Sequence, residues 1–123
     1  MSYYISNKVE HTSDYFAPVL GELEQLVLLA LVRLGNGTYG AAIRREIFER
    51  TGRDASVSSV YVTLERLKEK GMVVSYVGNP TALRGGRRRT HYILDTPGQQ
   101  ALGRAYRTWV TMTDGIAPVL SQM

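Results

Sequence analysis

The chain has 123 residues, no cysteine, two histidines and a formal net charge of +4. This length suits one domain with a modest core, or one domain with an extension that needs a partner to bury it. The lack of cysteine excludes disulfides and thiolate chemistry, and His11 and His91 are too few for a zinc site, so we expect no metal and no cofactor.

The excess positive charge lies in the middle of the chain. Residues 38–92 hold eleven Lys or Arg and five Asp or Glu, whereas residues 1–37 hold two basic and four acidic residues, and residues 93–123 hold two of each sign. A basic centre between acidic or neutral ends is expected when one face of a protein meets a polyanion. Acidic proteins and anionic membrane surfaces would attract the same charge.

The role of the N-terminal arm, residues 1–19, is left open by its sequence. Its apolar and aromatic residues are more numerous than in most disordered tails: Tyr3, Tyr4, Ile5, Tyr15 and Phe16. The arm either packs on the C-terminal helix of a partner subunit or has no role. It contains no apolar run like that of a signal peptide, and no run in the chain reaches membrane-spanning length. We therefore expect a soluble cytoplasmic protein with no membrane partner.

A largely buried helix is predicted for residues 20–34, which are dense in Leu, Val and Ala. Glu22 and Glu24 stand at its start, where the helix dipole favours negative charge. The helix is expected to stop at Gly35-Asn36-Gly37, because glycine and asparagine favour turns.

A second helix is predicted for residues 39–50, with Thr38 as its cap and Gly52 after its end. Three apolar side chains would face inward and three basic ones would stay in solvent: Ala42, Ile43 and Ile47, and Arg44, Arg45 and Arg50 respectively.

A third helix is predicted for residues 56–70, with Gly71 as a left-handed cap at its end. Its apolar residues recur at three- and four-residue spacings, the pattern of a helix packed against a core: Val57, Val60, Leu64 and Leu67.

The outward face of this third helix would carry Ser58, Ser59, Tyr61 and Val62 near its start. Small hydroxyl groups can approach a base edge or a phosphate closely, and a valine methyl can meet a thymine methyl. The simpler interpretation is that a serine, Ser56 or Ser58, only caps the helix. The sequence leaves both interpretations open.

A β-hairpin is predicted after the third helix, with strands at residues 72–77 and 90–94. The connection between the strands, residues 78–89, contains Gly, Pro and Asn and then four arginines. A long basic tip is therefore expected between the two strands.

Three helices followed by a hairpin indicate a winged helix-turn-helix domain over residues 20–95. In this arrangement the third helix enters the major groove of DNA and the hairpin, or wing, lies along the neighbouring backbone. The predicted fold class is thus mainly α with a small β-hairpin, with a C-terminal dimerisation helix at residues 96–123.

Residues 28–102 resemble the PadR family of bacterial transcriptional regulators, through short motifs in three consecutive elements. The motifs are Thr38-Tyr39-Gly40 with Ile43 and Arg45 in the second helix, Ser59-Val60-Tyr61 with Leu64, Arg66-Leu67 and Lys70-Gly71 in the third, and Gly85-Gly86-Arg87-Arg88-Arg89 with Tyr92 and Leu94 in the hairpin. Asp95 stands where members usually carry threonine, and aspartate can cap a helix equally well. The resemblance implies a homodimer that represses transcription from a pseudo-palindromic operator in double-stranded DNA, often until a small molecule is sensed.

The C-terminal helix gives separate support for a dimer. Thr96-Pro97-Gly98-Gln99 has the spacing of a capping box, with proline at the first helical position. The helix then places large apolar side chains on one seam that a single domain has no need to cover: Leu102, Ala105, Tyr106, Trp109, Met112 and Ile116. The alternative is that the helix folds back over its own winged domain as ordinary core.

Ten residues are assigned to DNA. Arginines of the wing would reach phosphates or the minor groove, unless they only guard a solvated sheet edge, and Tyr61 would donate its hydroxyl to a phosphate, unless it is simply packed. The start of the second helix would clamp the flanking strand. The assigned residues are Tyr39, Arg44, Ser58, Ser59, Tyr61, Val62, Arg66, Arg87, Arg88 and Arg89.

A small planar or apolar effector, if the protein senses one, is expected at the aromatic seam, next to Leu26, Leu29, Tyr106 and Trp109. Two other classes of function compete with DNA binding. A winged helix can serve as a protein-interaction module without binding DNA. An enzyme is the weaker rival, because His91 has no Ser, Asp or Glu at a spacing that suggests a catalytic partner.

Overall fold

The three-dimensional structure is a computed structural model that describes residues 19–35, 37–78 and 88–123. The N-terminal arm up to residue 18 and most of the wing tip, Arg87 included, lie outside the described residues. In chain order the elements are α2 (Glu22–Leu34), β1 (Thr38–Tyr39), α3 (Gly40–Thr51), α4 (Val57–Glu69), β2 (Val73–Val77), β3 (Thr90–Leu94), α5 (Thr96–Thr113) and α6 (Ala117–Leu120). This mainly helical order with a small sheet confirms the predicted fold class.

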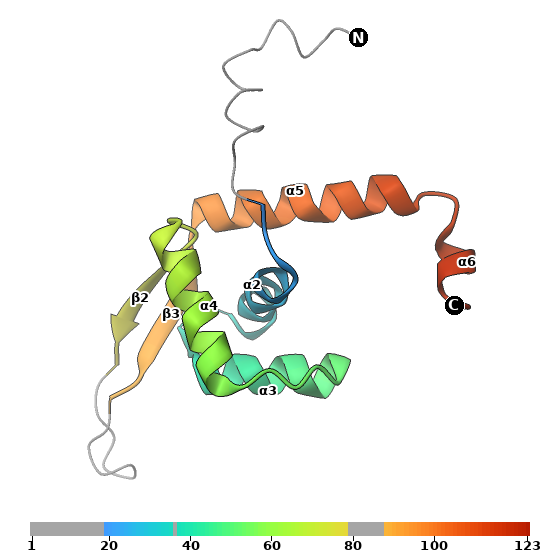
Figure 1. Cartoon of the computed structure of the whole chain (residues 1–123). Helices are drawn as coiled ribbons and strands as arrows, with labels where there is room; N and C mark the ends of the chain where they lie inside the picture. Colours follow the sequence, from blue (N-terminus) through green and yellow to red (C-terminus); the bar gives the residue numbers. More distant parts are fainter. Residues whose placement is uncertain (1–18, 36, 79–87) are drawn as a thin grey trace, which may run out of the picture.

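The core lies between α2, α3 and α4, with α2 in the middle of the domain (Figure 1). The predicted apolar faces of these helices are buried, and they contribute Val27, Leu28, Leu31, Ile43, Ile47, Val60, Leu64 and Leu67. One residue of the predicted stripe was wrong: Val57 is 41% exposed. It is the first residue of α4, so no preceding turn of the helix holds it against the core.

The ends of α3 and α4 are set by short-range contacts. The Ser56 hydroxyl accepts a hydrogen bond from the backbone N–H of Ser59 at 3.0 Å, so Ser56 caps α4. Of the two serines predicted as possible caps, Ser56 and Ser58, the first is therefore the cap. Gly71 has a φ of 76°, which confirms the predicted left-handed residue after α4. The predicted Thr38 cap was wrong, because Thr38 lies in β1 and the cap position of α3 is occupied by Tyr39.

The sheet has three antiparallel strands in the order β1-β3-β2, where the sequence predicted a hairpin of two. The added strand, β1, places Thr38 opposite Tyr92 and Tyr39 opposite His91. On the inner face of the sheet Tyr92 is only 2% exposed, and its hydroxyl donates a hydrogen bond to the carboxylate of Glu65 on α4 at 2.9 Å. The sheet is thereby attached to the third helix of the domain.

The first half of α5 packs on the domain, and its second half extends beyond it (Figure 1). The side chain of Asp95 accepts a hydrogen bond from the Thr96 N–H at 2.9 Å, so Asp95 is the cap and the predicted capping box at Thr96 was wrong. The helix ends at Thr113, and Gly115 turns the chain with a φ of 80° before α6. Ile116, expected on the seam of α5, therefore lies beyond that helix.

Candidate nucleic-acid interface

The outward face of α4 presents four of the side chains assigned to DNA. Ser58, Ser59, Val62 and Arg66 are all exposed, and Val62 keeps 51% of its surface in solvent. Farther along the helix, a shallow hollow of about 430 Å³ is lined by Tyr61, Val62, Glu65, Arg66 and Glu69. This face has the small hydroxyls, the methyl groups and the guanidinium that a helix needs to read base edges in a major groove.

Tyr61 is half-buried, and its ring lies against the backbone of α3. A Cβ atom at Gly40 would be only 2.6 Å from Cζ of that ring, and the ring centroid lies 6.4 Å from that of Tyr92. Tyr61 therefore has a packing role, and a hydrogen bond from its hydroxyl to a phosphate stays a prediction.

Arg44 does not stay in solvent as the sequence predicted. Its Nε donates to the carbonyl of Ala55 at 3.0 Å, its Nη2 pairs with Asp54, and its guanidinium lies over the ring of Phe48. These contacts tie α3 to the connection that leads into α4. These contacts occupy Nε and Nη2 of the guanidinium, so the structure favours a supporting role for Arg44.

The base of the wing brings together residues from all three strands. The guanidinium carbon of Arg89 lies 4.1 Å from the centre of the Tyr39 ring, within the range of a cation–π contact. His91 stacks on Tyr76 with ring centroids 5.1 Å apart, and meets Tyr39 edge-on at 5.9 Å. Arg88 is exposed.

Ion pairing distinguishes the basic residues of the domain. Five of them pair with carboxylates: Arg33, Arg44, Arg50, Arg53 and Lys70. Within the described part of the chain, seven basic residues form no such pair: Arg45 on α3, Arg66 and Lys68 on α4, Arg88 and Arg89 at the base of the wing, and Arg104 and Arg107 on α5. Four of these seven residues lie on α4 and at the base of the wing, the two elements that a winged helix turns toward phosphates.

The exposed seam of α5 differs in part from the predicted one. Leu102 and Ala105 pack against the core of their own domain, whereas Tyr106, Trp109 and Met112 are 69%, 62% and 73% exposed. The folded-back alternative thus describes the first half of the helix and not the second.

A hollow of about 190 Å³ lies beside this seam. It is lined by Gln25, Leu29, Leu102, Ala105, Tyr106 and Trp109. Leu26, assigned to the effector pocket from the sequence, instead packs against the core. Sequence reasoning missed Gln25, although it lies four residues before Leu29 and so on the same face of α2.

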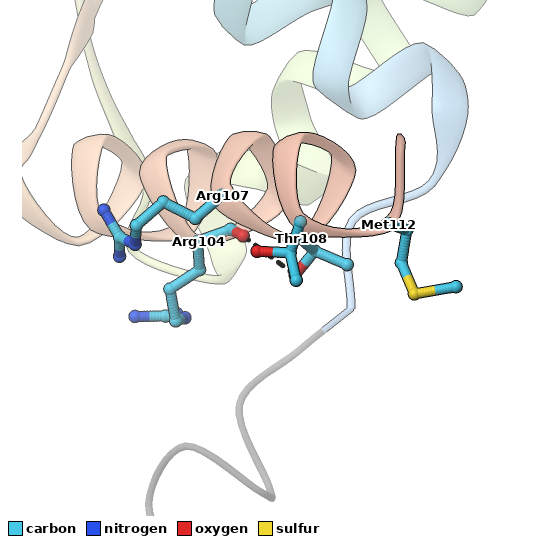
Figure 2. Close-up of a pocket in the computed structure, with 5 residues that line it drawn as sticks. Arg104, Arg107, Thr108 and Met112 are labelled. Atoms are coloured by element: carbon cyan, nitrogen blue, oxygen red, sulfur yellow. Dashed lines mark hydrogen bonds between the residues drawn. The ribbon is translucent and has the colours of Figure 1, made fainter. Parts of the chain in front are cut away.

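A second hollow on α5, of about 440 Å³, has a different character. Arg104, Arg107, Thr108, Thr111 and Met112 line it. Figure 2 shows the two arginines reaching the same way along the helix, while the Thr108 hydroxyl donates to the Arg104 carbonyl at 3.0 Å. Neither arginine was assigned a role from the sequence, although their three-residue spacing places them on one face of the helix.

No group of three His, Asp or Glu side chains in residues 19–35, 37–78 and 88–123 is arranged to hold a metal ion. In the same ranges, none of the helices combines the length and the apolar character needed to cross a bilayer.

Comparisons with known proteins match most of the chain. The model of the transcriptional regulator PadR-like family matches residues 28–104. The chain is similar to a PadR family transcription regulator from Clostridium difficile R20291, with a TM-score of 0.68 and 25% identity over 81% of this chain and 99% of that one. A PadR family transcriptional regulator from Eggerthella lenta DSM 2243 has a TM-score of 0.61 and 21% identity over 95% of this chain and 92% of that one. No curated protein matches.

Proposed function

The chain belongs to the PadR-like family of transcriptional regulators, and from that premise we propose a homodimeric repressor that binds a pseudo-palindromic operator in the bacterial cytoplasm. Members of this family are DNA-binding regulators of transcription and not enzymes. The observation that carries the proposal is that Arg66 on α4, and Arg88 and Arg89 at the base of the wing, form no ion pair within the described residues and lie on the two elements that meet DNA in a winged helix.

In the proposed complex, α4 enters the major groove and the wing follows the adjacent backbone. Ser58, Ser59 and Val62 would meet base edges near the start of α4, and Arg66 would meet a base or a phosphate. The arginines of the wing would bind phosphates through their planar guanidinium groups. The Tyr61 ring would support α4, because it packs against the backbone of α3, and Arg44 would fix the connection that leads into α4 through Asp54 and Ala55.

The exposed apolar residues of the C-terminal region support the homodimer. Beyond Ala105, large apolar side chains remain in solvent on α5 and α6: Tyr106, Trp109, Val110, Met112, Val119 and Leu120. Exposed patches of this kind mark interaction surfaces. A second copy of the chain would cover them and hold two α4 helices about one turn of DNA apart.

An effector would bind at the hollow beside Trp109, at the edge of the same surface. Its lining is mainly apolar, with Tyr106 and Trp109 as two exposed rings. A planar apolar molecule suits such a lining. Because the hollow touches both α2 and α5, a bound molecule could change how α5 is set on the domain and so change the spacing of the two α4 helices.

Fluorescence anisotropy tests the DNA-binding part of the proposal. Purified protein is titrated with the duplex upstream of its own coding sequence, and with a shuffled duplex, across a series of salt concentrations. One variant carries Arg88→Ala with Arg89→Ala. The matched control carries Arg104→Ala with Arg107→Ala, which removes the same charge from α5.

We expect the wild-type protein to bind the upstream duplex more tightly than the shuffled one. In the wing variant, the slope of log binding constant against log salt concentration should become flatter by about 0.9 for each lost phosphate contact. The α5 control should keep the slope of the wild-type protein. Absence of binding to either duplex at low salt would contradict the proposal and favour a winged-helix module that binds other proteins.

A further inference from the structure

Three rings cross the sheet in one row, on the face opposite the core. Tyr39 of β1 and Tyr76 of β2 both lie opposite His91 of β3 in the strand register. Neighbouring residues of a strand point to opposite faces, and the next residue, Tyr92, points into the core. Tyr39, His91 and Tyr76 therefore form a ring ladder on the outer face.

The ring ladder is held by the backbone at both edges. His91 Nδ1 lies 2.5 Å from the carbonyl oxygen of Gly37, and since a carbonyl can only accept, Nδ1 carries the proton. A Cβ atom at Gly37 would lie 2.8 Å from the Tyr76 hydroxyl, and one at Gly78 would lie 2.7 Å from His91 Nε2. The rings thus lie closely against two glycines, which restricts how they can move.

Arg89 continues this row from the wing. Its carbonyl accepts a hydrogen bond from the Gly78 N–H at 2.7 Å, which fixes its backbone next to the start of β3. Its guanidinium lies over the Tyr39 ring at 4.1 Å, and it forms no ion pair with an acidic side chain in the described ranges. The side chain is therefore held by a ring and keeps its charge for another partner.

We propose that Tyr39 is a positioning residue for DNA binding: its ring holds the guanidinium of Arg89 in the orientation that meets a phosphate. The inference rests on the proposed function, because it takes Arg89 as a phosphate ligand. Holding a flexible side chain in place before binding lowers the entropy lost on binding. This role needs the face of the ring and not its hydroxyl, unlike the direct DNA contact predicted for Tyr39 from the sequence.

Anisotropy with the shuffled duplex at low salt tests the inference, because sequence-independent binding depends on phosphates. The variants are Arg89→Ala, Tyr39→Phe, Tyr39→Leu and the double variant Tyr39→Leu with Arg89→Ala. Tyr76→Leu is the matched control, since it removes a ring of the ladder that Arg89 does not contact. Thermal unfolding of each variant shows whether the fold persists.

The expected pattern is specific to positioning. Tyr39→Phe should bind like wild type, and Tyr39→Leu should bind about two- to fivefold more weakly, the factor that corresponds to an exposed cation–π contact. Tyr39→Leu should add no further loss when Arg89 is already alanine, and Tyr76→Leu should keep the wild-type affinity. Should Tyr39→Leu not fold, Tyr39→Met tests the same contact, because methionine fills irregular space without an aromatic face, and it should weaken binding by the same factor.

Other outcomes separate the two proposals. If Arg89→Ala leaves affinity unchanged, the phosphate contact of Arg89 is absent and the inference is overturned, while the other residues of the interface remain to be tested by their own variants. If Arg89→Ala weakens binding but Tyr39→Leu does not, or if their losses add, Tyr39 does not act through Arg89. A loss in Tyr39→Phe equal to that in Tyr39→Leu would assign the contact to the hydroxyl.

Discussion

The ring of Tyr61 on α4 lies over the backbone of Gly40, the first residue of α3, so closely that a Cβ atom there would be 2.6 Å from Cζ. The residue before Gly40 is Tyr39, whose ring contacts Arg89 of the wing. Tyr39 and Gly40 thus join the two elements assigned to DNA, because one residue contacts the wing and the next contacts α4. The relative placement of α4 and the wing depends on this junction.

Gly40→Ala is expected to destabilise the domain by about 1–3 kcal/mol, the usual cost of forcing an extra carbon into a packed contact. Urea unfolding measures this loss, and DNA affinity should fall as well because Tyr61 must move. Gly103→Ala is the control: its Cβ would meet only the end of the flexible Arg107 side chain at 3.2 Å. An alanine inside α5 should be neutral or stabilising by up to about 1 kcal/mol. Equal effects of the two substitutions would show that the Tyr61 contact is unimportant.

Substitutions of two serines at the start of α4 should have different effects, one on stability and the other on DNA binding. The Ser56 hydroxyl accepts the Ser59 N–H at 3.0 Å and donates to the Ser59 hydroxyl at 2.9 Å, so Ser56→Ala should cost about 1 kcal/mol of stability. The Ser58 hydroxyl is exposed and hydrogen bonds to the Ser56 hydroxyl at 3.2 Å, with no bond to a backbone group of the described residues, so Ser58→Ala should leave the urea midpoint nearly unchanged and weaken DNA binding. A stability loss in Ser58→Ala that matches Ser56→Ala would assign the cap to both serines.

The sequence predicted the parts of the fold that depend on contacts between residues close in the chain, and it missed parts that depend on distant residues. Periodic apolar residues identified α2, α3 and α4, and Ser56 and Gly71 marked the two ends of α4, because the relevant contacts lie within a few residues. The strand β1 was missed because two residues carry no periodic pattern and their pairing with β3 spans more than fifty positions. The same limit applies to Arg44, whose partners Asp54 and Ala55 lie across a turn that periodicity does not describe.

Glu24 should make stability depend on acid pH. Its partial burial would raise its pKa, but hydrogen bonds from Lys70 and from the Gly21 N–H, with the charges of Lys70 and Arg66, hold the pKa below its ordinary value of 4.5. A carboxyl group with a lowered folded-state pKa stabilises the fold above its unfolded value, and this contribution is lost as pH falls through the folded value. Glu24→Gln should therefore cost about 1 kcal/mol at pH 7 and nothing well below pH 4.5.

Urea unfolding between neutral and acid pH measures this difference. Glu49→Gln on α3 is the control, because Glu49 is exposed and forms no ion pair within the described part of the chain. It should shift stability little at any pH. If the loss caused by Glu24→Gln stays the same in acid, the Lys70 pair is not its source.

Tyr92 should make the stability of the fold depend on pH in the alkaline range. Burial, the hydrogen bond to Glu65 and the charge of that carboxylate raise the pKa of Tyr92 above its ordinary value of 10. A raised folded-state pKa gives stability that is complete below the unfolded value and declines as pH rises through the folded value. Tyr92→Phe should cost about 1 kcal/mol at pH 7, and this gap should narrow above pH 10, where the unfolded wild-type chain ionises. A gap that does not change between pH 7 and pH 11 would contradict this assignment.

Trp109→Asp should separate two copies of the chain without unfolding either. Trp109 is 62% exposed on the projecting half of α5, so the substitution removes little from the core of its own domain. In the proposed homodimer, Trp109→Asp would bury a carboxylate in the apolar contact between the subunits. It should therefore weaken dimer association roughly 100-fold or more. Val62→Asp on α4 is the control, since Val62 is 51% exposed and lies on the face assigned to DNA.

Sedimentation equilibrium over a range of concentrations distinguishes the two variants. Wild type and Val62→Asp should sediment as dimers, and Trp109→Asp as a monomer with an unchanged circular dichroism spectrum. On the upstream duplex, Val62→Asp should lose specific binding as a dimer, whereas Trp109→Asp should protect one half-site where wild type protects two. A Trp109→Asp protein that still sediments as a dimer would place the subunit contact away from this part of α5, because a carboxylate without a partner is not tolerated in an apolar interface.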